Sequence, residues 1–230
     1  ETAYHDQPMG RPTLGTEELI ADMRRETLMD YMRAHYTTQN MVIAAAGNLH
    51  HQQVLDLVET HFRDLPTHKP SRQAPSRYDG GESRVSRDLD QAHLVLGFPS
   101  VAYGDPDYHA IMLLSTILGG GMSSRLFQEI REKRGLVYSV YSFALPFLDN
   151  GLFGIYAGTG EKQAAELVPV VLDELHRIPD GIAPDELARA RAQLKSSLLM
   201  SLESTGSRCE QIARQLQIHG RVIPTSETVA

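Results

Sequence analysis

The stretch GGGMSSRLFQEIREKRGLVYSVYS, residues 119–142, decides how the second half of the chain folds. Three glycines interrupt an apolar helical pattern, and glycine permits both a close backbone approach and a positive φ. The residues after them predict a helix over 122–134 that ends at Gly135. A strand is expected to follow over 137–144, so that a tight turn joins the helix to the strand.

Working outward from this stretch, the sequence predicts an α+β fold with a mainly antiparallel sheet packed against helices. Further strands are expected over 84–98 and 152–157, the latter closing a hairpin with 137–144. The remaining apolar runs at helical spacing predict helices over 16–36 with a break near Arg24, and over 50–65, 105–118, 162–178, 184–202 and 207–220. The continuously apolar residues 41–46 predict a strand that is covered on both faces.

Residues 66–83 are rich in proline and glycine and are expected to be an exposed linker. The linker divides the chain into a first portion, residues 1–65, and a second portion, residues 84–230. Each portion is expected to belong to a separate domain.

Composition excludes several functional classes. The chain has 230 residues and a formal net charge of −7, which argues against a nucleic-acid groove or an anionic membrane surface as partner. Its longest apolar run, residues 110–118, is far shorter than the roughly 20 residues of a membrane span. We therefore expect no nucleic-acid partner and no membrane span.

No pattern of metal ligands or nucleophiles is readable in the chain. The motifs H-x-x-E-H, H-E-x-x-H and C-x-x-C are absent, and the adjacent His50 and His51 cannot face one metal from a helix. The single cysteine, Cys209, lies in a helical pattern without a nearby histidine, and no G-x-S-x-G motif occurs. The sequence predicts no metal site.

Arg131 and Tyr138 are the remaining candidates for chemistry, because they flank the turn between helix and strand. A guanidinium binds a peptide carbonyl or carboxylate with forked donors, and a phenol can donate to an oxyanion as it forms. A purely structural alternative stays open. In that alternative Arg131 is a solvated residue near a helix C-terminus, and Tyr138 pairs across the hairpin.

This part of the sequence resembles the second-domain signature of the M16 metallopeptidases, the family of pitrilysin, insulin-degrading enzyme and mitochondrial processing peptidase. The matching residues are GGGMSSRLF at 119–127, Arg131, and GLVYS at 135–139. The first portion resembles the later half of the family's first domain through PMGRP at 8–12, LGT at 14–16, HY at 35–36, NMV at 40–42 and AGN at 46–48. Gln7 departs from the family, in which histidine is frequent at this position.

The resemblance implies M16-type α+β domains that enclose a chamber for peptides or unfolded segments. It implies a zinc ion held by two histidines of H-x-x-E-H and a later glutamate. It also implies that an arginine and a tyrosine seven residues apart bind substrate and stabilise the tetrahedral intermediate, which Arg131 and Tyr138 match. Substrate is expected to add as a strand to a sheet edge. Further substrate contacts are expected at Gly119, Gly120, Gly121 and Ser123.

The family's zinc motif is missing, and its place in the family lies upstream of Glu1. We therefore expect residues 1–65 to be the C-terminal half of a first domain whose upstream half-domain is missing. Residues 84–230 are expected to be most of a second domain, incomplete at its C-terminus. Zinc is expected in the parent protein or in a partner chain, with none bound by this chain.

Two functions follow from the resemblance. In the first, the parent is a bacterial zinc endopeptidase that acts on peptides as a homo- or heterodimer with another M16 chain. In the second, it is a non-catalytic partner or scaffolding subunit of an M16-type complex. The 230 residues alone are expected to be inactive in both cases, and the periplasm and the cytoplasm are both open as the compartment.

Overall fold

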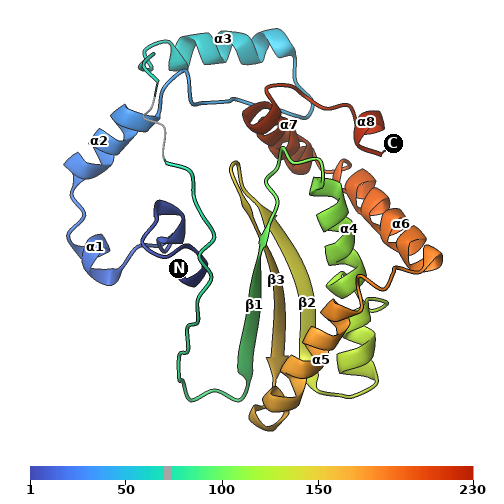
Figure 1. Cartoon of the computed structure of the whole chain (residues 1–230). Helices are drawn as coiled ribbons and strands as arrows, with labels where there is room; N and C mark the ends of the chain where they lie inside the picture. Colours follow the sequence, from blue (N-terminus) through green and yellow to red (C-terminus); the bar gives the residue numbers. More distant parts are fainter. Residues whose placement is uncertain (70–73, 230) are drawn as a thin grey trace. The chain divides into compact units, whose positions relative to one another are not determined.

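The computed structural model describes residues 1–69 and 74–229, and the chain divides into two spatial units (Figure 1). The first unit combines Glu1–Gly10 with Ser76–Ser197, and the second combines Arg11–Pro75 with Leu198–Ala230. Each unit is therefore built from segments that are distant along the chain. The assignment of 1–65, 66–83 and 84–230 to a domain, a linker and a second domain stays a prediction.

A three-stranded antiparallel sheet organises the first unit. Its strands are β1 (Ala92–Ser100), β2 (Val137–Pro146) and β3 (Gly151–Thr159), with β3 between the other two. The α+β fold and the hairpin of β2 with β3 are confirmed. The predicted start of the first strand at residue 84 is wrong. β1 begins at Ala92 because its partner β3 ends at Thr159, which pairs with Ala92.

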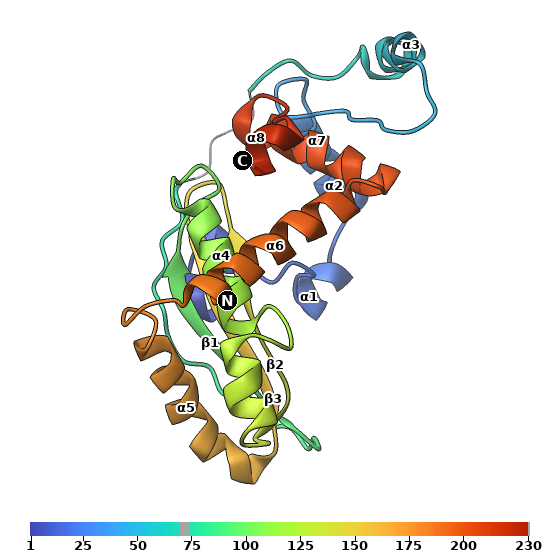
Figure 2. The same cartoon turned by 90° about the vertical axis from the view of Figure 1, so that its right-hand side faces the viewer.

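Helices cover one face of this sheet. Figures 1 and 2 show α4 (Tyr108–Gly119) and α5 (Ala164–His176) on the same side of the strands. Large side chains from helices and strands are fully buried there: Leu118, Leu126, Ile130, Ile155, Leu167 and Val171. Burying a side chain of this size contributes about 1.5–3 kcal/mol, so this face is the core. Four short helices and the start of α6 (Pro184–Ser201) complete the unit: η1 (Thr2–Tyr4), η2 (Pro8–Gly10), η3 (Phe127–Glu132) and η4 (Glu161–Gln163).

The second unit is helical in the part of the chain that the structure describes. Besides the end of α6, its helices are α1 (Glu17–Ala21), α2 (Arg25–His35), α3 (His51–Phe62), α7 (Thr205–His219) and α8 (Thr225–Val229). Thr16 caps α1, because its side chain accepts a hydrogen bond from Leu19 N at 3.3 Å. Many large apolar side chains of this unit are exposed, among them Leu28, Tyr31, Ile43, Leu57 and Met200.

The predicted strand over residues 41–46 is wrong. This run has no strand assignment, and no strand pairs with it within residues 1–69 and 74–229. Ile43 is 43% exposed, so the run is also not covered on both faces. An apolar composition favours a buried strand only where a neighbouring strand is present to satisfy the backbone.

The structure contains no helix, among the residues that it describes, with both the length and the apolar character needed to cross a membrane.

Candidate functional site

The triple glycine ends α4 at the place where this helix meets β2. A Cβ atom on Gly119 would lie only 2.2 Å from the backbone nitrogen of Ser142, so this position needs a residue without a side chain. The nearest atom to a Cβ on Gly121 is 3.7 Å away, an ordinary contact. The close approach is therefore confirmed at Gly119. A positive φ is not found at any of the three glycines, and Gly120 has a φ of −80°.

The loop after the glycines is held by its own polar groups. Ser124 is buried, and its Oγ donates to Gly121 O at 2.6 Å. Gln128 Nε2 donates to Met122 O at 2.7 Å. Ser123 is exposed in this fixed loop, whereas Gly119 is buried. The role of Ser123 and of the three glycines as substrate contacts stays a prediction.

A bidentate ion pair ties this loop to α6. Arg125 Nε donates to Glu186 Oε1 at 2.7 Å, Nη2 donates to Oε2 at 2.8 Å, and Nη2 also donates to Gly181 O at 3.0 Å. The two side chains are 18% and 15% exposed. Their hydrogen bonding raises the pKa of Arg125 and lowers the pKa of Glu186. From two turns further along α6, Gln193 Nε2 donates to Gly120 O at 2.7 Å, so α6 holds the loop at two points.

Arg131 lies in a π-helix, so the prediction of a regular helix over 122–134 is wrong in its detail. The helical part covers only residues 125–132, and η3 (Phe127–Glu132) within it is π-helical. The spacing of apolar residues over six positions does not show whether each backbone N–H bonds to the carbonyl four residues earlier, as in an α-helix, or five residues earlier, as in a π-helix. The sequence therefore did not predict the π-helical turn. π-helical turns are rare in proteins, and those that occur are often at functional sites. The predicted stop is confirmed, because Gly135 has a φ of +61° and its N–H donates to Arg131 O at 3.1 Å.

The guanidinium of Arg131 is the unpaired cation of this segment. Its Cζ lies 4.9 Å from the centroid of the Phe127 ring, a cation–π distance. The nearby carboxylate of Glu129 is instead paired with Lys133 and with Arg134, which lowers the pKa of Glu129. Within residues 1–69 and 74–229, Arg131 makes no ion pair. Arg131 is exposed, so its guanidinium contacts solvent as well as the ring of Phe127.

Tyr138 is the extra residue of a β-bulge in β2. Its neighbours Val137 and Ser139 pair with two consecutive residues of β3, so Tyr138 is skipped. Val137 and Val140 are both buried, although residues three apart in a regular strand point to opposite faces. The bulge thus leaves Tyr138 off the core face and 66% exposed, with no partner for its hydroxyl in the described part of the chain. Bulges re-aim side chains in this way beside active sites.

Metal-ligating side chains do not converge here. The described residues contain no group of three or more His, Cys, Asp or Glu side chains that could hold a metal ion. The side chains present therefore do not fit a zinc site.

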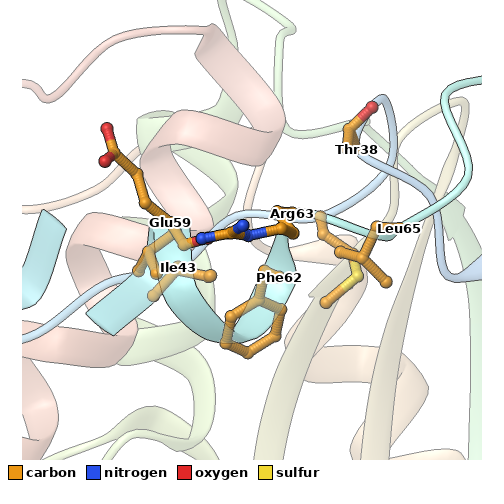
Figure 3. Close-up of a pocket in the computed structure, with 8 residues that line it drawn as sticks. Thr38, Ile43, Glu59, Phe62, Arg63 and Leu65 are labelled. Carbon is orange, nitrogen blue, oxygen red and sulfur yellow. The ribbon is translucent and has the colours of Figure 1, made fainter. Parts of the chain in front are cut away.

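A separate hollow of about 580 Å³ lies in the second unit (Figure 3). It is formed by α3 and by the segments before and after it, and Figure 3 shows the ring of Phe62 beside Ile43 and Leu65. The full lining is Thr38, Met41, Ile43, Val58, Glu59, Phe62, Arg63 and Leu65. None of the predicted site residues is among them, and the lining is mainly apolar.

Comparison with known proteins gives the family. Residues 22–194 match the model of the peptidase M16 inactive domain. The chain belongs to the peptidase M16 family. This match covers the triple glycine, η3 and the β2–β3 hairpin, and it agrees with the resemblance seen in the sequence.

Bacterial M16 relatives carry the name zinc protease. The chain is 36% identical to an uncharacterized zinc protease of Rickettsia bellii over 227 residues. It is 38% identical to one of Streptomyces coelicolor over 239 residues and 35% identical to one of Bacillus subtilis over 223 residues. These alignments cover 98%, 100% and 96% of this chain, but only 55%, 52% and 54% of the relatives. The chain thus spans about half of their length.

Solved structures share the M16 fold. The peptidase M16 inactive domain from Pseudomonas fluorescens superposes with a TM-score of 0.86 at 25% identity, covering 96% of this chain and 53% of that one. A chain of complex III from Candida albicans superposes with a TM-score of 0.89 at 24% identity, covering 99% and 57%. At that identity the second likeness shows the fold alone.

Three features of the site escaped the sequence analysis. The π-helical turn at Arg131 and the bulge at Tyr138 depend on hydrogen bonding that residue types do not encode directly. The contacts from α6 left one signal in the sequence. Glu186 and Gln193 are two helical turns apart and therefore lie on one face of the helix, but nothing in the sequence shows which segment that face contacts.

Proposed function

We propose that this chain is part of a zinc-dependent endopeptidase that cleaves peptides or unfolded segments. In this proposal Arg131 and Tyr138 supply the half of the site that binds substrate and stabilises the oxyanion. The observation that carries it is that two unusual backbone features occur at one turn. The guanidinium of Arg131, which has no ion pair, lies on a π-helical turn, and the exposed phenol of Tyr138 lies on a β-bulge. Both side chains flank one turn through Gly135, and neither is used in packing the core.

The chemistry assigned to the two residues follows from their donors. The fixed fork of Arg131 suits a peptide carbonyl or a carboxylate of the substrate. The hydroxyl of Tyr138 can donate to the oxygen on which negative charge develops. One such donor contributes about 2.7–4 kcal/mol of transition-state stabilisation.

Zinc in this proposal is held by residues outside this chain, in the parent protein or in a partner chain. The bound metal would supply an activated water and polarise the scissile carbonyl. The described residues do not fit a zinc site, so no step is assigned to a metal ligand of this chain. The 230 residues alone are accordingly expected not to hydrolyse peptides.

A further M16 segment is the proposed partner of the second unit. Large apolar side chains on α2, α3 and the run at 41–46 are exposed, and the hollow of Figure 3 opens among them. Exposed apolar surface of this extent marks an interaction site. It supports the expectation of an upstream half-domain, and of a homo- or heterodimer with another M16 chain.

The test is peptide cleavage by the full-length parent protein, with and without a chelator, on a quenched fluorescent peptide. Chelation is expected to abolish cleavage. Arg131→Ala and Tyr138→Phe are each expected to lower kcat about 100-fold. Arg134→Ala is the matched control and is expected to leave kcat unchanged, because Arg134 is already paired with Glu129.

A non-catalytic partner subunit is the competing function. The match to an inactive-domain model fits both functions, because relatives named zinc protease align over the same residues. A full-length protein that cleaves nothing alone, but restores cleavage to a second M16 chain carrying the zinc ligands, would establish this alternative.

A further inference from the structure

The face of the sheet opposite α4 and α5, here called the open face, is unusually apolar. Its residues alternate along each strand with those of the core, and several are exposed, including Val95 at 60% and Tyr141 at 46%. None of the residues of β1, β2 and β3 is Asp, Glu, Lys or Arg. A sheet face in contact with water normally carries polar side chains, so an apolar one marks an interaction site.

Four rings form a continuous row across the three strands of this face, here called the aromatic row. The rings of Tyr141 on β2 and Tyr156 on β3 are stacked, with centroids 4.9 Å apart and planes at 27°. His93 on β1 stacks on the other side of Tyr156 at 6.0 Å, and its Nδ1 lies 2.8 Å from the Tyr156 hydroxyl. Phe143 lies 6.2 Å from Tyr141 and extends the row along β2.

Glycines of β3 make room for these rings. A Cβ on Gly154 would lie 2.2 Å from the ring of Phe143, so this ring lies directly over the glycine backbone. A Cβ on Gly158 would lie 3.2 Å from the hydroxyl of Tyr156. The place of Phe143 in the row therefore depends on the missing side chain of Gly154, whereas a Cβ at Gly158 would be tight but could be accommodated.

Side chains of the first unit contact the open face beside Gly97 of β1. The hydroxyl of Tyr78 donates to Gly97 O at 2.7 Å, and this ring contacts Tyr4 edge-on. The aromatic row begins beyond that contact. Tyr138 lies at the other end, on the same strand as Tyr141 and off the core face like it. Three residues of strand span about 10 Å, the length of three residues of an extended peptide.

We propose that the aromatic row of His93, Tyr156, Tyr141 and Phe143 is a specificity subsite that binds an aromatic or large aliphatic side chain of the peptide substrate. The inference rests on the proposed function, because it takes Tyr138 as the point at which the peptide is held. A peptide held there places a side chain two or three residues away against the row. Stacked ring faces on strands that contain no Asp, Glu, Lys or Arg favour aromatic side chains and disfavour charged ones.

The size of the row also favours a substrate side chain over a second copy of the chain. A stable dimer buries about 800 Å² on each partner, from roughly 20–30 residues. Four rings between the Tyr78 contact and Tyr138 are too few for such an interface, but they suffice for one or two side chains of an extended peptide.

The test measures peptide binding separately from cleavage, with the full-length protein freed of zinc by chelation. The probes are fluorescein-labelled octapeptides that differ only in having Phe, Ala or Glu at one scanned position, followed by fluorescence anisotropy. At one position we expect the Phe peptide to bind about 10-fold more tightly than the Ala peptide, with Glu weakest. Tyr141→Leu and Tyr156→Leu should each reduce this ratio to about 3-fold or less.

Tyr103→Leu, a tyrosine of the first unit that lies outside the row with its ring against Tyr108, is the matched control and should keep the full ratio. A Phe preference that is missing in the wild type, or that survives both substitutions in the row, would overturn the proposal. So would a dimer in sedimentation that dissociates in Tyr141→Leu, since the row would then contact a second copy.

Cleavage by the zinc-loaded protein separates the two proposals. Cleavage without a Phe preference retains the proposed endopeptidase and rejects the subsite. A Phe preference in binding that depends on the row, without any cleavage, retains the subsite and rejects the endopeptidase.

Discussion

Replacing Gly119 by alanine tests how closely α4 packs on β2. The added Cβ would lie 2.2 Å from Ser142 N and 2.8 Å from Tyr141 C, both backbone atoms of β2. Real Cβ contacts are not found below 3.0 Å, so the end of the helix and the strand must separate by about 1 Å. A flexible side chain could move aside, but β2 is paired with β3 at Tyr141, Ser142 and Phe143 and cannot move here without a cost.

The expected loss is about 1–4 kcal/mol of unfolding free energy. Overpacking a well-packed site costs about 1–3 kcal/mol. Separation also breaks the hydrogen bond of 2.7 Å that Ser142 Oγ donates to Ser115 O, worth about 1 kcal/mol. Alanine recovers up to about 1 kcal/mol because it favours a helix more than glycine does.

Gly121→Ala is the matched control. The nearest atom to its Cβ is Gln193 Nε2 at 3.7 Å, and its φ is not positive, so the unfolding free energy should change by less than about 0.5 kcal/mol. Urea unfolding followed by tyrosine fluorescence suits the measurement, because the chain has nine tyrosines and no tryptophan. All of the tyrosines except Tyr31 and Tyr36 lie in the first unit, so this probe follows that unit.

Two results would contradict the reasoning. If Gly119→Ala unfolds within about 0.5 kcal/mol of the wild type, the contact between α4 and β2 is looser than the structure has it. If Gly119→Ala and Gly121→Ala lose the same stability, the triple glycine acts through backbone flexibility and not through the close approach of Gly119.

Three further predictions concern the rest of the site. Glu186→Gln should lower the unfolding free energy by about 2 kcal/mol at neutral pH, between the values for exposed and buried ion pairs. Because Arg125 lowers the folded-state pKa of Glu186 below its usual 4.5, this contribution is present above pH 4.5 and is lost as the pH falls through the folded pKa. The difference between wild type and variant in urea unfolding should therefore shrink as the pH falls below 4.5, and a constant difference would contradict the assignment. Gly135→Ala should cost about 1 kcal/mol in thermal unfolding, because its φ is +61° and no atom lies within 4 Å of the added Cβ. If Arg131 and Tyr138 act on one transition state, the double variant should lose less in kcat than the product of the two single losses, and a simple product would indicate independent roles.

Much of the fold was predictable from the spacing of apolar residues along the chain. Helical spacing of apolar residues located α4 to α7 within a few residues, and the hairpin of β2 with β3 was readable from two apolar runs and a polar turn. Local patterns succeed there because each element buries a face whose period the sequence repeats. The run at 41–46 shows the limit, because it has the composition of a buried strand but lacks a neighbouring strand in the described residues.

The sequence by itself determined the family, the α+β class and the two candidate residues, Arg131 and Tyr138. It did so because glycines at fixed places and an arginine seven residues before a tyrosine form a motif that is local in the chain. Only the tertiary structure decided that the arginine lies on a π-helical turn, that the tyrosine is bulged off the core face, and that rings from three strands align beside it. These features depend on which backbone groups pair across the sheet and which helix packs against which loop, and such pairings join residues that are far apart in sequence.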